Sequence, residues 1–233
     1  MNIRLNMWLT LVQSCKVTPG YVHLSSFLAQ HLFKVNIVSR IHDHVWDETT
    51  FALRKALKKY VKDGQRILDL GTGHLGCLSV YCSKIRKVDV LGIDINEGYV
   101  KNARKVAAAS GRPMIKFERS DWFSNVDGKF DIIFGNIPYV PTNNGMQRKD
   151  PHNDVEVWDG GDDGCKHVRK VLGEGGKHLS DQGRLLLGVN TLYVPKSVDL
   201  SCLTKESGLK LEHIVKSPWT PSEVYVFSLV PYY

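Results

Sequence analysis

Three closely spaced glycines between a short strand and a helix constrain the fold of this chain most. Two apolar residues, Ile67 and Leu68, lead into Asp69, and the glycines follow within Gly71-Thr72-Gly73-His74-Leu75-Gly76. A helical pattern then begins at Cys77. Glycine accepts a positive φ and lets the backbone approach a ligand, while the start of a helix offers free N–H groups. The spacing predicts a strand, a tight turn and a helix that together hold an electron-rich ligand. A turn without a ligand is the alternative.

Acidic residues flank this turn. Asp69 stands two residues before the first glycine, and a second expected strand, residues 88–93, ends at Asp94. An acidic residue about twenty positions after the glycines is placed to accept both hydroxyls of a ribose. This arrangement fits a dinucleotide or S-adenosylmethionine, and Asp69 favours the second.

The run from Asp69 to Gly76 resembles motif I of class I S-adenosylmethionine-dependent methyltransferases, in which the glycine turn faces the methionine part of the cofactor. The resemblance implies S-adenosylmethionine as the cofactor. It assigns cofactor binding in this region to Asp69, Gly71, Thr72, Gly73, Gly76, Asp94 and Ile95.

A third expected strand, residues 115–117, leads to Asp121 and Trp122. Ligands of open α/β folds bind at the carboxyl ends of the strands, where Asp121 would lie. In the resembled family a carboxylate here accepts the adenine amino group and an apolar neighbour lies against the ring, so both residues are expected to bind the cofactor. The alternative is a loop aspartate that caps a short turn.

The segment Asn136-Ile137-Pro138-Tyr139 follows a fourth expected strand, residues 130–134. Pro138 ends strand pairing and extends the residue before it, so the Asn136 side chain and the Ile137 carbonyl are free to accept hydrogen bonds from a planar NH2 group. Tyr139 offers an aromatic face for stacking. The segment resembles the N-P-P-Y motif of methyltransferases that act on planar nitrogens, with Ile137 in place of the first proline. We therefore expect Asn136, Ile137, Pro138 and Tyr139 to be catalytic, with Asn136 also at the cofactor.

A polar tract over residues 141–164 has the length of an active-site loop. Its end, Asp159-Gly160-Gly161-Asp162-Asp163-Gly164, resembles a segment of the protein-glutamine N5-methyltransferases that modify translation release factors. A turn that caps a helix near residues 164–173 is the alternative reading.

The order of elements predicts an α/β fold. The resemblance implies the three-layer, Rossmann-like sandwich of class I methyltransferases, with a seven-stranded sheet whose last strand is antiparallel and lies between strands five and six. We expect residues 46–233 to form this domain, with Asp47 as the cap of a helix over residues 51–61. Residues 1–45 are expected to be a helical extension, because apolar residues near Phe27 and Leu32 recur at helical spacing.

Composition limits partners and location. The net charge of +7 favours polyanions such as RNA, although no long run of like charge is present. Five cysteines without a C-x-x-C pair indicate a reducing compartment, so we expect a cytoplasmic protein. Residues 7–12 are apolar but too short to span a membrane, and no membrane association is expected. His42-Asp43-His44 lacks completing ligands, so no metal site is expected.

Direct methyl transfer to an amide nitrogen is the reaction that the resemblance implies. The expected substrate is a glutamine of a protein, such as a translation release factor. Some relatives work with a small activator protein, which is a possible partner here. An exocyclic base amine of RNA or DNA and a small molecule remain alternative acceptors, and a scaffold that has lost turnover is the non-enzymatic alternative.

Overall fold

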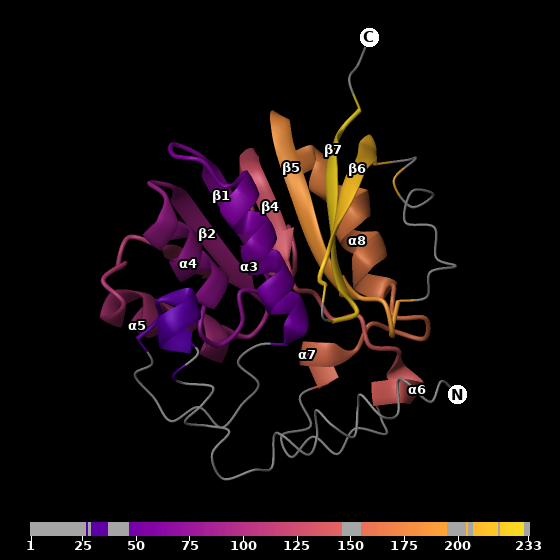
Figure 1. Cartoon of the computed structure of the whole chain (residues 1–233), viewed down its shortest axis with the longest axis horizontal. Coiled ribbons are helices and arrows are strands. Elements are labelled where there is room, and N and C mark those ends of the chain that lie inside the picture. The colour runs from indigo at the N-terminus through magenta and orange to yellow at the C-terminus, as the bar shows by residue number, and fades with distance from the viewer. Residues whose placement is uncertain are drawn as a thin grey trace.

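A single seven-stranded sheet organises the computed structural model, which describes residues 27, 29–36, 47–145, 155–194, 204, 207–218 and 220–230. The strand order is β3-β2-β1-β4-β5-β7-β6 (Figure 1). The strands are β1 (Arg66–Leu70), β2 (Asp89–Asp94), β3 (Lys116–Arg119), β4 (Phe130–Gly135), β5 (Leu179–Asn190), β6 (Leu209–Lys216) and β7 (Ser222–Leu229).

The first five strands run parallel, and β7 pairs antiparallel with both β5 and β6. The expected closing pair, with its last strand between the fifth and the sixth, is confirmed. The fifth strand is longer than the sequence predicted, since β5 begins at Leu179 rather than at residue 183.

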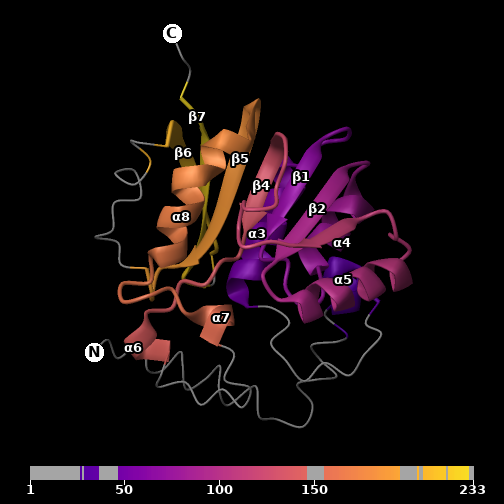
Figure 2. The same cartoon turned by 180° about the vertical axis from the view of Figure 1, so that it is seen from behind.

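Helices cover both faces of the sheet. They are α3 (Glu48–Tyr60), α4 (Cys77–Ile85), α5 (Glu97–Ala109), α6 (Thr142–Gly145), α7 (Val155–Trp158) and α8 (Lys166–Gly175), with a π-helix η1 (Ala29–Phe33) and a 3-10 turn η2 (Gly176–His178). The helix α3 stands in front of the sheet in Figure 1, whereas α8 comes to the front when the molecule is turned in Figure 2.

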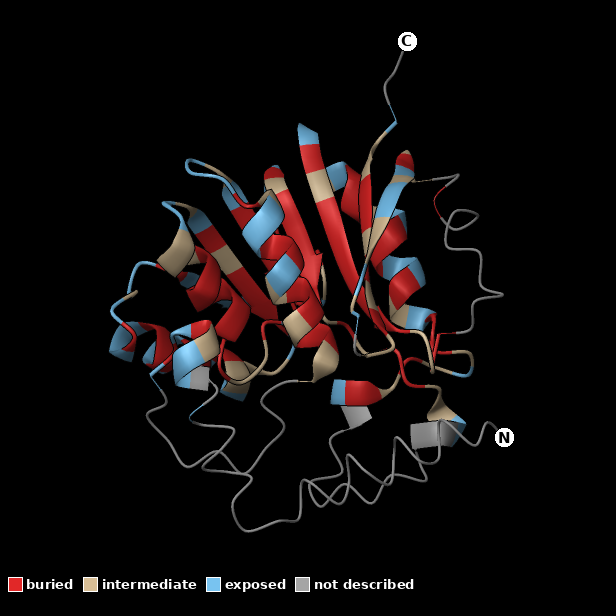
Figure 3. Cartoon of the chain, viewed as in Figure 1, coloured by how far each residue is buried: buried red, intermediate tan, exposed pale blue. Residues whose placement is uncertain are grey.

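The core divides along the sheet because successive strand residues point to opposite faces. Ile67 packs in one cluster with α3, α4 and α5, while its neighbour Leu68 packs in a second cluster with α8. Figure 3 shows buried residues along the strands and on the helix faces turned toward them. The predicted three-layer α/β sandwich is thereby confirmed.

The described part of the expected N-terminal extension packs against the sheet domain. Phe33 and Val35 are fully buried in the cluster that contains α3, α4 and α5. The backbone N–H of Asn36 donates to Ser110 Oγ over 2.8 Å. Most of residues 1–46, including Leu24, Leu28 and the His42–His44 triplet, lie outside the described residues, so the division at residue 45 stays a prediction.

The start of α3 brings this helix to the site. Asp47 caps it as predicted: its Oδ1 accepts from the N–H of Thr50 over 2.9 Å, and Thr50 Oγ1 accepts in return from the N–H of Asp47. The side chains of Leu53 and Leu57 are fully buried on the side of the helix that faces the sheet. Because α3 crosses the sheet and leads directly into the parallel strands, its amino end lies at their carboxyl ends.

Candidate functional site

The four segments that follow β1, β2, β3 and β4 meet at one edge of the sheet, the edge formed by the carboxyl ends of these strands. We call these segments the corners of the site. Strand register places Leu70 beside both Ile93 and Gly135, and Asp94 beside Arg119. The residues that follow these pairs are therefore neighbours: the glycine turn after β1, the end of β2, the loop after β3 and the loop after β4. The helices α6 and α7 lie beyond the same ends of the strands in Figure 1.

The glycine turn has the conformation that its sequence predicts. Gly71, Gly73 and Gly76 all have positive φ, at 67°, 68° and 55°. A Cβ added at Gly71 or Gly73 would meet no atom of the described residues within 4 Å, so none of them fills the space beside this part of the turn. A Cβ at Gly76 would lie 2.7 Å from the Phe117 ring. The third glycine thus permits close packing, while the first two leave room for a ligand.

Asp69 supports the turn from beneath. It is 2% exposed, and its Oδ2 accepts from Ser79 Oγ over 2.7 Å and from Thr72 Oγ1 over 2.9 Å. Burial raises the pKa of the Asp69 carboxyl to about 6. These contacts tie the strand, the turn and α4 together. Direct binding of the cofactor by Asp69 stays a prediction, as it does for Thr72, which is buried.

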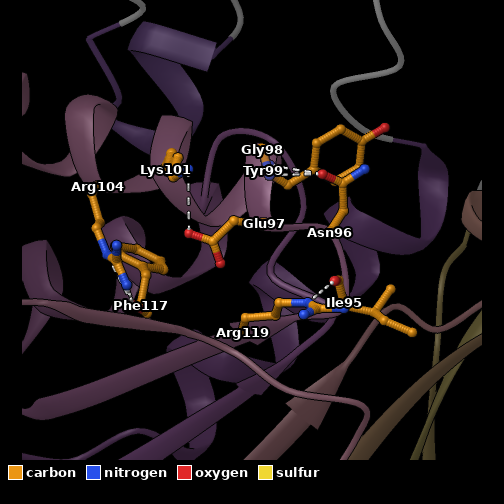
Figure 4. Close-up of polar contacts among 9 residues, drawn as sticks. All are labelled: Ile95, Asn96, Glu97, Gly98, Tyr99, Lys101, Arg104, Phe117 and Arg119. Carbon is orange, nitrogen blue, oxygen red and sulfur yellow. Dashed lines mark hydrogen bonds and ion pairs between the residues drawn. The ribbon is translucent and has the colours of Figure 1, made fainter.

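Asp94 braces the other side of the turn. Its Oδ2 accepts from the N–H of Gly73 over 2.9 Å, and its Oδ1 accepts from the N–H of Asn96 over 3.0 Å. Asn96 caps α5, and Arg119 Nε donates to the carbonyl of Ile95 over 3.1 Å (Figure 4). This corner is fixed by its own neighbours, while the Ile95 side chain is 45% exposed at the edge.

The loop after β3 meets the start of α8. Asp121 is exposed, and its Oδ1 lies 3.7 Å from Lys170 Nζ. Trp122 has a positive φ of 49°, and its ring centroid is 5.1 Å from that of His167. Burial, reinforced by Lys166, lowers the pKa of His167. The two residues expected to bind adenine are therefore at the edge, and their contact with the cofactor stays a prediction.

The hydrogen-bond partners of Asn136 lie at the start of α3, 86 and 89 positions earlier in the sequence. Its Nδ2 donates to Asp47 Oδ1 over 3.0 Å and to Thr50 Oγ1 over 3.2 Å. Asn136 Oδ1 is buried and accepts no hydrogen bond from the described part of the chain. An acceptor in this state is unusual, because most buried polar atoms in proteins have a partner.

Tyr139 belongs to the same network. Its hydroxyl donates to Asp47 Oδ2 over 2.8 Å and lies 2.8 Å from Thr49 Oγ1, which in turn lies 3.1 Å from Ser222 Oγ on β7. Burial, with the nearby Asp47 carboxyl, raises the pKa of the Tyr139 hydroxyl well above its ordinary value. The ring is 6.1 Å from that of Tyr193. Its stacking on a substrate stays a prediction, as do the roles of Ile137, which is 1% exposed, and of the half-buried Pro138.

The glycine-rich end of the polar tract lies against this loop. The N–H of Val140 donates to the carbonyl of Trp158 over 2.9 Å, and the N–H of Gly160 returns a bond to the Val140 carbonyl over 2.7 Å. A Cβ at Gly164 would lie 2.5 Å from the Tyr139 carbonyl oxygen, so only glycine fits there. Two of the three segments that carried the family resemblance are thus packed together. The helix α8 follows at Lys166, close to the start of the helix that the alternative reading places near residues 164–173. Residues 146–154 of the tract lie outside the described residues.

The contribution of α3 to this site was missed from the sequence. Asp47 was recognised as a helix cap, but its hydrogen bonds to Asn136 and Tyr139 were not foreseen. The signal was available in the topology, because a helix that precedes the first parallel strand begins at the edge where ligands bind. Its capping group therefore lies within reach of the loop after β4.

The residues present fit S-adenosylmethionine. Three features lie around the carboxyl edge of the sheet. They are the space beside Gly71 and Gly73, the nearly buried carboxylate of Asp94, and the Asn136 oxygen, which accepts no hydrogen bond from the described residues. Within the ranges that the structure describes, no group of three His, Cys, Asp or Glu side chains could hold a metal ion. None of the helices in those ranges has the length and apolar content that a membrane crossing requires.

Known proteins share both sequence and fold with this chain. The profile of the methyltransferase-domain family matches residues 61–197, more than half of the chain. A release factor glutamine methyltransferase of Agrobacterium fabrum is 32% identical over 71% of the chain, which spans 57% of that relative. A ribosomal protein L11 methyltransferase of Thermosipho africanus is 41% identical over 39% of the chain and 34% of its own length.

A solved structure supports the same fold. The crystal structure of a methyltransferase from Pyrococcus furiosus superposes with a TM-score of 0.66 and covers 89% of this chain and 95% of its own, at 18% identity. The family profile and this superposition agree with the glycine turn and the strand order. The chain belongs to the methyltransferase-domain family, with the fold of class I S-adenosylmethionine-dependent methyltransferases, and S-adenosylmethionine is its cofactor.

Proposed function

We propose that this protein transfers a methyl group from S-adenosylmethionine to the side-chain nitrogen of a glutamine in a protein. The observation that carries the proposal is in the loop after β4, where Asn136 Oδ1 is buried and accepts no hydrogen bond from the described residues. Asn136 directly follows Gly135, which pairs with Leu70 just before the glycine turn. An N–H group of a substrate would supply the missing donor. The glutamine amide is a planar group with two such hydrogens.

The reaction depends on orientation more than on acid or base catalysis. When bound, the cofactor would supply an electrophilic methyl group and would leave as a neutral thioether, and the amide nitrogen would lose one proton after the transfer. An amide nitrogen is a poor nucleophile because its lone pair is delocalised. Asn136 Oδ1 and the Ile137 carbonyl accept the two N–H groups, so that the developing lone pair faces the methyl carbon. Both acceptors bind more strongly as the nitrogen gains positive charge, which favours the transition state over the ground state.

Relatives support a protein substrate. The Agrobacterium fabrum relative is named for release factor glutamine methylation, and the Thermosipho africanus relative for methylation of a ribosomal protein. The first alignment is the longer of the two and spans the glycine turn. We therefore propose a translation release factor as the substrate, with a small activator protein as a possible further partner.

An exocyclic amine of an RNA base is the second candidate, because adenine and guanine present a planar NH2 group and the chain carries a net charge of +7. The same acceptors would hold that nitrogen. The two candidates differ in the class of macromolecule that receives the methyl group, so one assay separates them.

In a first experiment the protein is incubated with labelled S-adenosylmethionine and a cell lysate. In a second experiment a purified release factor takes the place of the lysate. We expect label that protease releases and nuclease does not, together with a mass increase of one methyl group on a glutamine. Asn136→Ala protein serves as the control and should leave the substrate unlabelled. Label that nuclease releases would show that the methyl acceptor is a base amine and not a glutamine. No label in either fraction would refute methyl transfer.

A further inference from the structure

We propose that Asp47 is a positioning residue that fixes the orientation of the Asn136 amide and so makes the site choose an amide over a carboxylate. The inference rests on the proposed glutamine methylation and extends it to substrate selection. Asp47 would not touch the substrate itself, because its carboxylate is occupied by the groups that it holds.

The Asp47 carboxylate is surrounded by donors. Its Oδ1 accepts from the N–H of Thr50 over 2.9 Å, from Thr50 Oγ1 over 3.1 Å and from Asn136 Nδ2 over 3.0 Å. Its Oδ2 accepts from the Tyr139 hydroxyl over 2.8 Å. One side chain at the start of α3 thus binds both polar residues of the loop after β4, 89 and 92 positions along the chain.

This contact decides which atom Asn136 presents elsewhere. An ionised carboxylate only accepts hydrogen bonds, so the NH2 group of Asn136, and not its oxygen, must face Asp47. The amide is planar, and turning it over would place two oxygens against each other. The oxygen is therefore directed away from Asp47, where it is buried and accepts no bond from the described residues.

A fixed oxygen at this position discriminates between similar side chains. A glutamine amide donates an N–H to it, while a glutamate of nearly the same shape offers only oxygens and is repelled. A buried acceptor left without a donor is costly, and this cost is how sites built for an N–H reject analogues that lack one. Without Asp47, Asn136 could turn over, and its NH2 group would then donate hydrogen bonds to a substrate carboxylate.

Asp47→Asn tests the inference without removing the helix cap, because asparagine is among the best capping residues. The variant side chain can donate as well as accept, so it no longer fixes Asn136. We expect at least a ~10-fold loss in kcat, with the affinity for S-adenosylmethionine within about twofold of wild type. The wild type should bind the release factor with glutamine at the labelled position more tightly than the same protein with glutamate there. In Asp47→Asn the ratio of the two affinities, glutamine form to glutamate form, should fall toward one.

A thermal double-mutant cycle tests the contact independently of any substrate. Asp47→Asn and Asn136→Ala should each lower Tm by about 2–4 °C, and the double variant should lose less than the sum of the two. Additive losses would overturn the fixed orientation, and an unchanged glutamine-to-glutamate ratio in Asp47→Asn would overturn the selection. A wild-type protein that labels no glutamine would refute the proposed function and the selection with it, while the cycle would still decide whether Asp47 holds Asn136.

Asp131→Asn is the matched control. Asp131 is a half-buried carboxylate near the opposite end of β4, where Oδ2 accepts from the N–H of Arg66 and Oδ1 from Ser180 Oγ, each over 2.8 Å. The substitution should lower Tm by a similar amount and leave both kcat and the glutamine-to-glutamate ratio unchanged. A change in that ratio in the control would show that it reports stability and would overturn the assignment to Asp47.

Discussion

The turn after β1 and the loop after β4 lie side by side at one edge of the sheet, yet they are held in different ways. The turn is closed by residues near it: Thr72 and Ser79 donate to Asp69, and Gly73 donates to Asp94. The loop is held by α3, and its Asn136 oxygen has no donor among the described residues. In the first region both carboxylates accept hydrogen bonds from the turn and its neighbours, and in the second the described residues leave one buried oxygen without a donor.

This difference separates the two halves of the proposed reaction. A turn that is braced by two nearby carboxylates can hold the cofactor in the same way for many substrates. A loop with an unsatisfied buried acceptor is adapted to one kind of partner, namely a group that donates a hydrogen bond. Variants of the loop should therefore affect methyl transfer, whereas variants of the turn should affect stability and cofactor affinity.

Asn136→Ala tests the separation with the largest expected effect. Removal of the amide takes away one preorganised acceptor, and we expect methyl transfer to fall by at least ~10²-fold. Cofactor affinity, measured by calorimetry, should stay near that of wild type. Full turnover in this variant would refute the proposed mechanism. A large loss of cofactor affinity would show that the two corners are not separate.

Gly76→Ala probes the turn through stability. The added Cβ would lie 2.7 Å from the Phe117 ring at a φ of 55°, so backbone strain and overpacking act together. We expect a loss of roughly 3 kcal/mol in the free energy of unfolding, measured with denaturant.

Gly73→Ala is the comparison for this prediction, because its φ is also positive but its Cβ would meet nothing within 4 Å. It should cost only about 1 kcal/mol, from the backbone alone, and should weaken cofactor binding. Equal losses in the two variants would mean that packing against Phe117 does not matter.

Asp69 gives the stability of the turn a pH dependence. Its folded-state pKa of about 6 lies above the ordinary value of 3.8, so the native state prefers the protonated form. This contribution to stability is full below pH 4 and is lost as the pH rises through 6. The loss is on the order of 3 kcal/mol. Thermal unfolding should show wild type losing stability relative to Asp69→Asn between pH 4 and 6. A constant difference would contradict the shift.

Sequence reasoning succeeded where the determinants are local. Positive φ at Gly71, Gly73 and Gly76 follows from glycine at a tight turn, and the cap at Asp47 follows from its place before a helical pattern. The place of the last strand, between the fifth and the sixth, came from the family resemblance, and the structure confirms it. These features depend on short stretches of chain, or on a fold that many sequences share.

The partners of Asn136 and Tyr139 could not be predicted in the same way. Both bind Asp47, which is some 90 positions away, and hydrogen bonds over such a separation leave no periodic pattern in the sequence. The direction of the Asn136 oxygen depends on these bonds.

Thr49→Val should have the smallest effect and shows how far the network around the loop extends. Thr49 is fully buried, and its hydroxyl links Tyr139 to Ser222, while Tyr139 keeps its bond to Asp47. We expect a loss of about 1 kcal/mol in stability and little change in methyl transfer, measured with the labelled release factor. Ser222→Ala, which removes only the outer hydroxyl, is the matched control. If Thr49→Val slows methyl transfer as much as Asn136→Ala does, the orientation of the loop depends on the hydroxyls of Tyr139, Thr49 and Ser222 together rather than on Asp47. The contrast between a turn held by its neighbours and a loop held by one distant residue would then no longer hold.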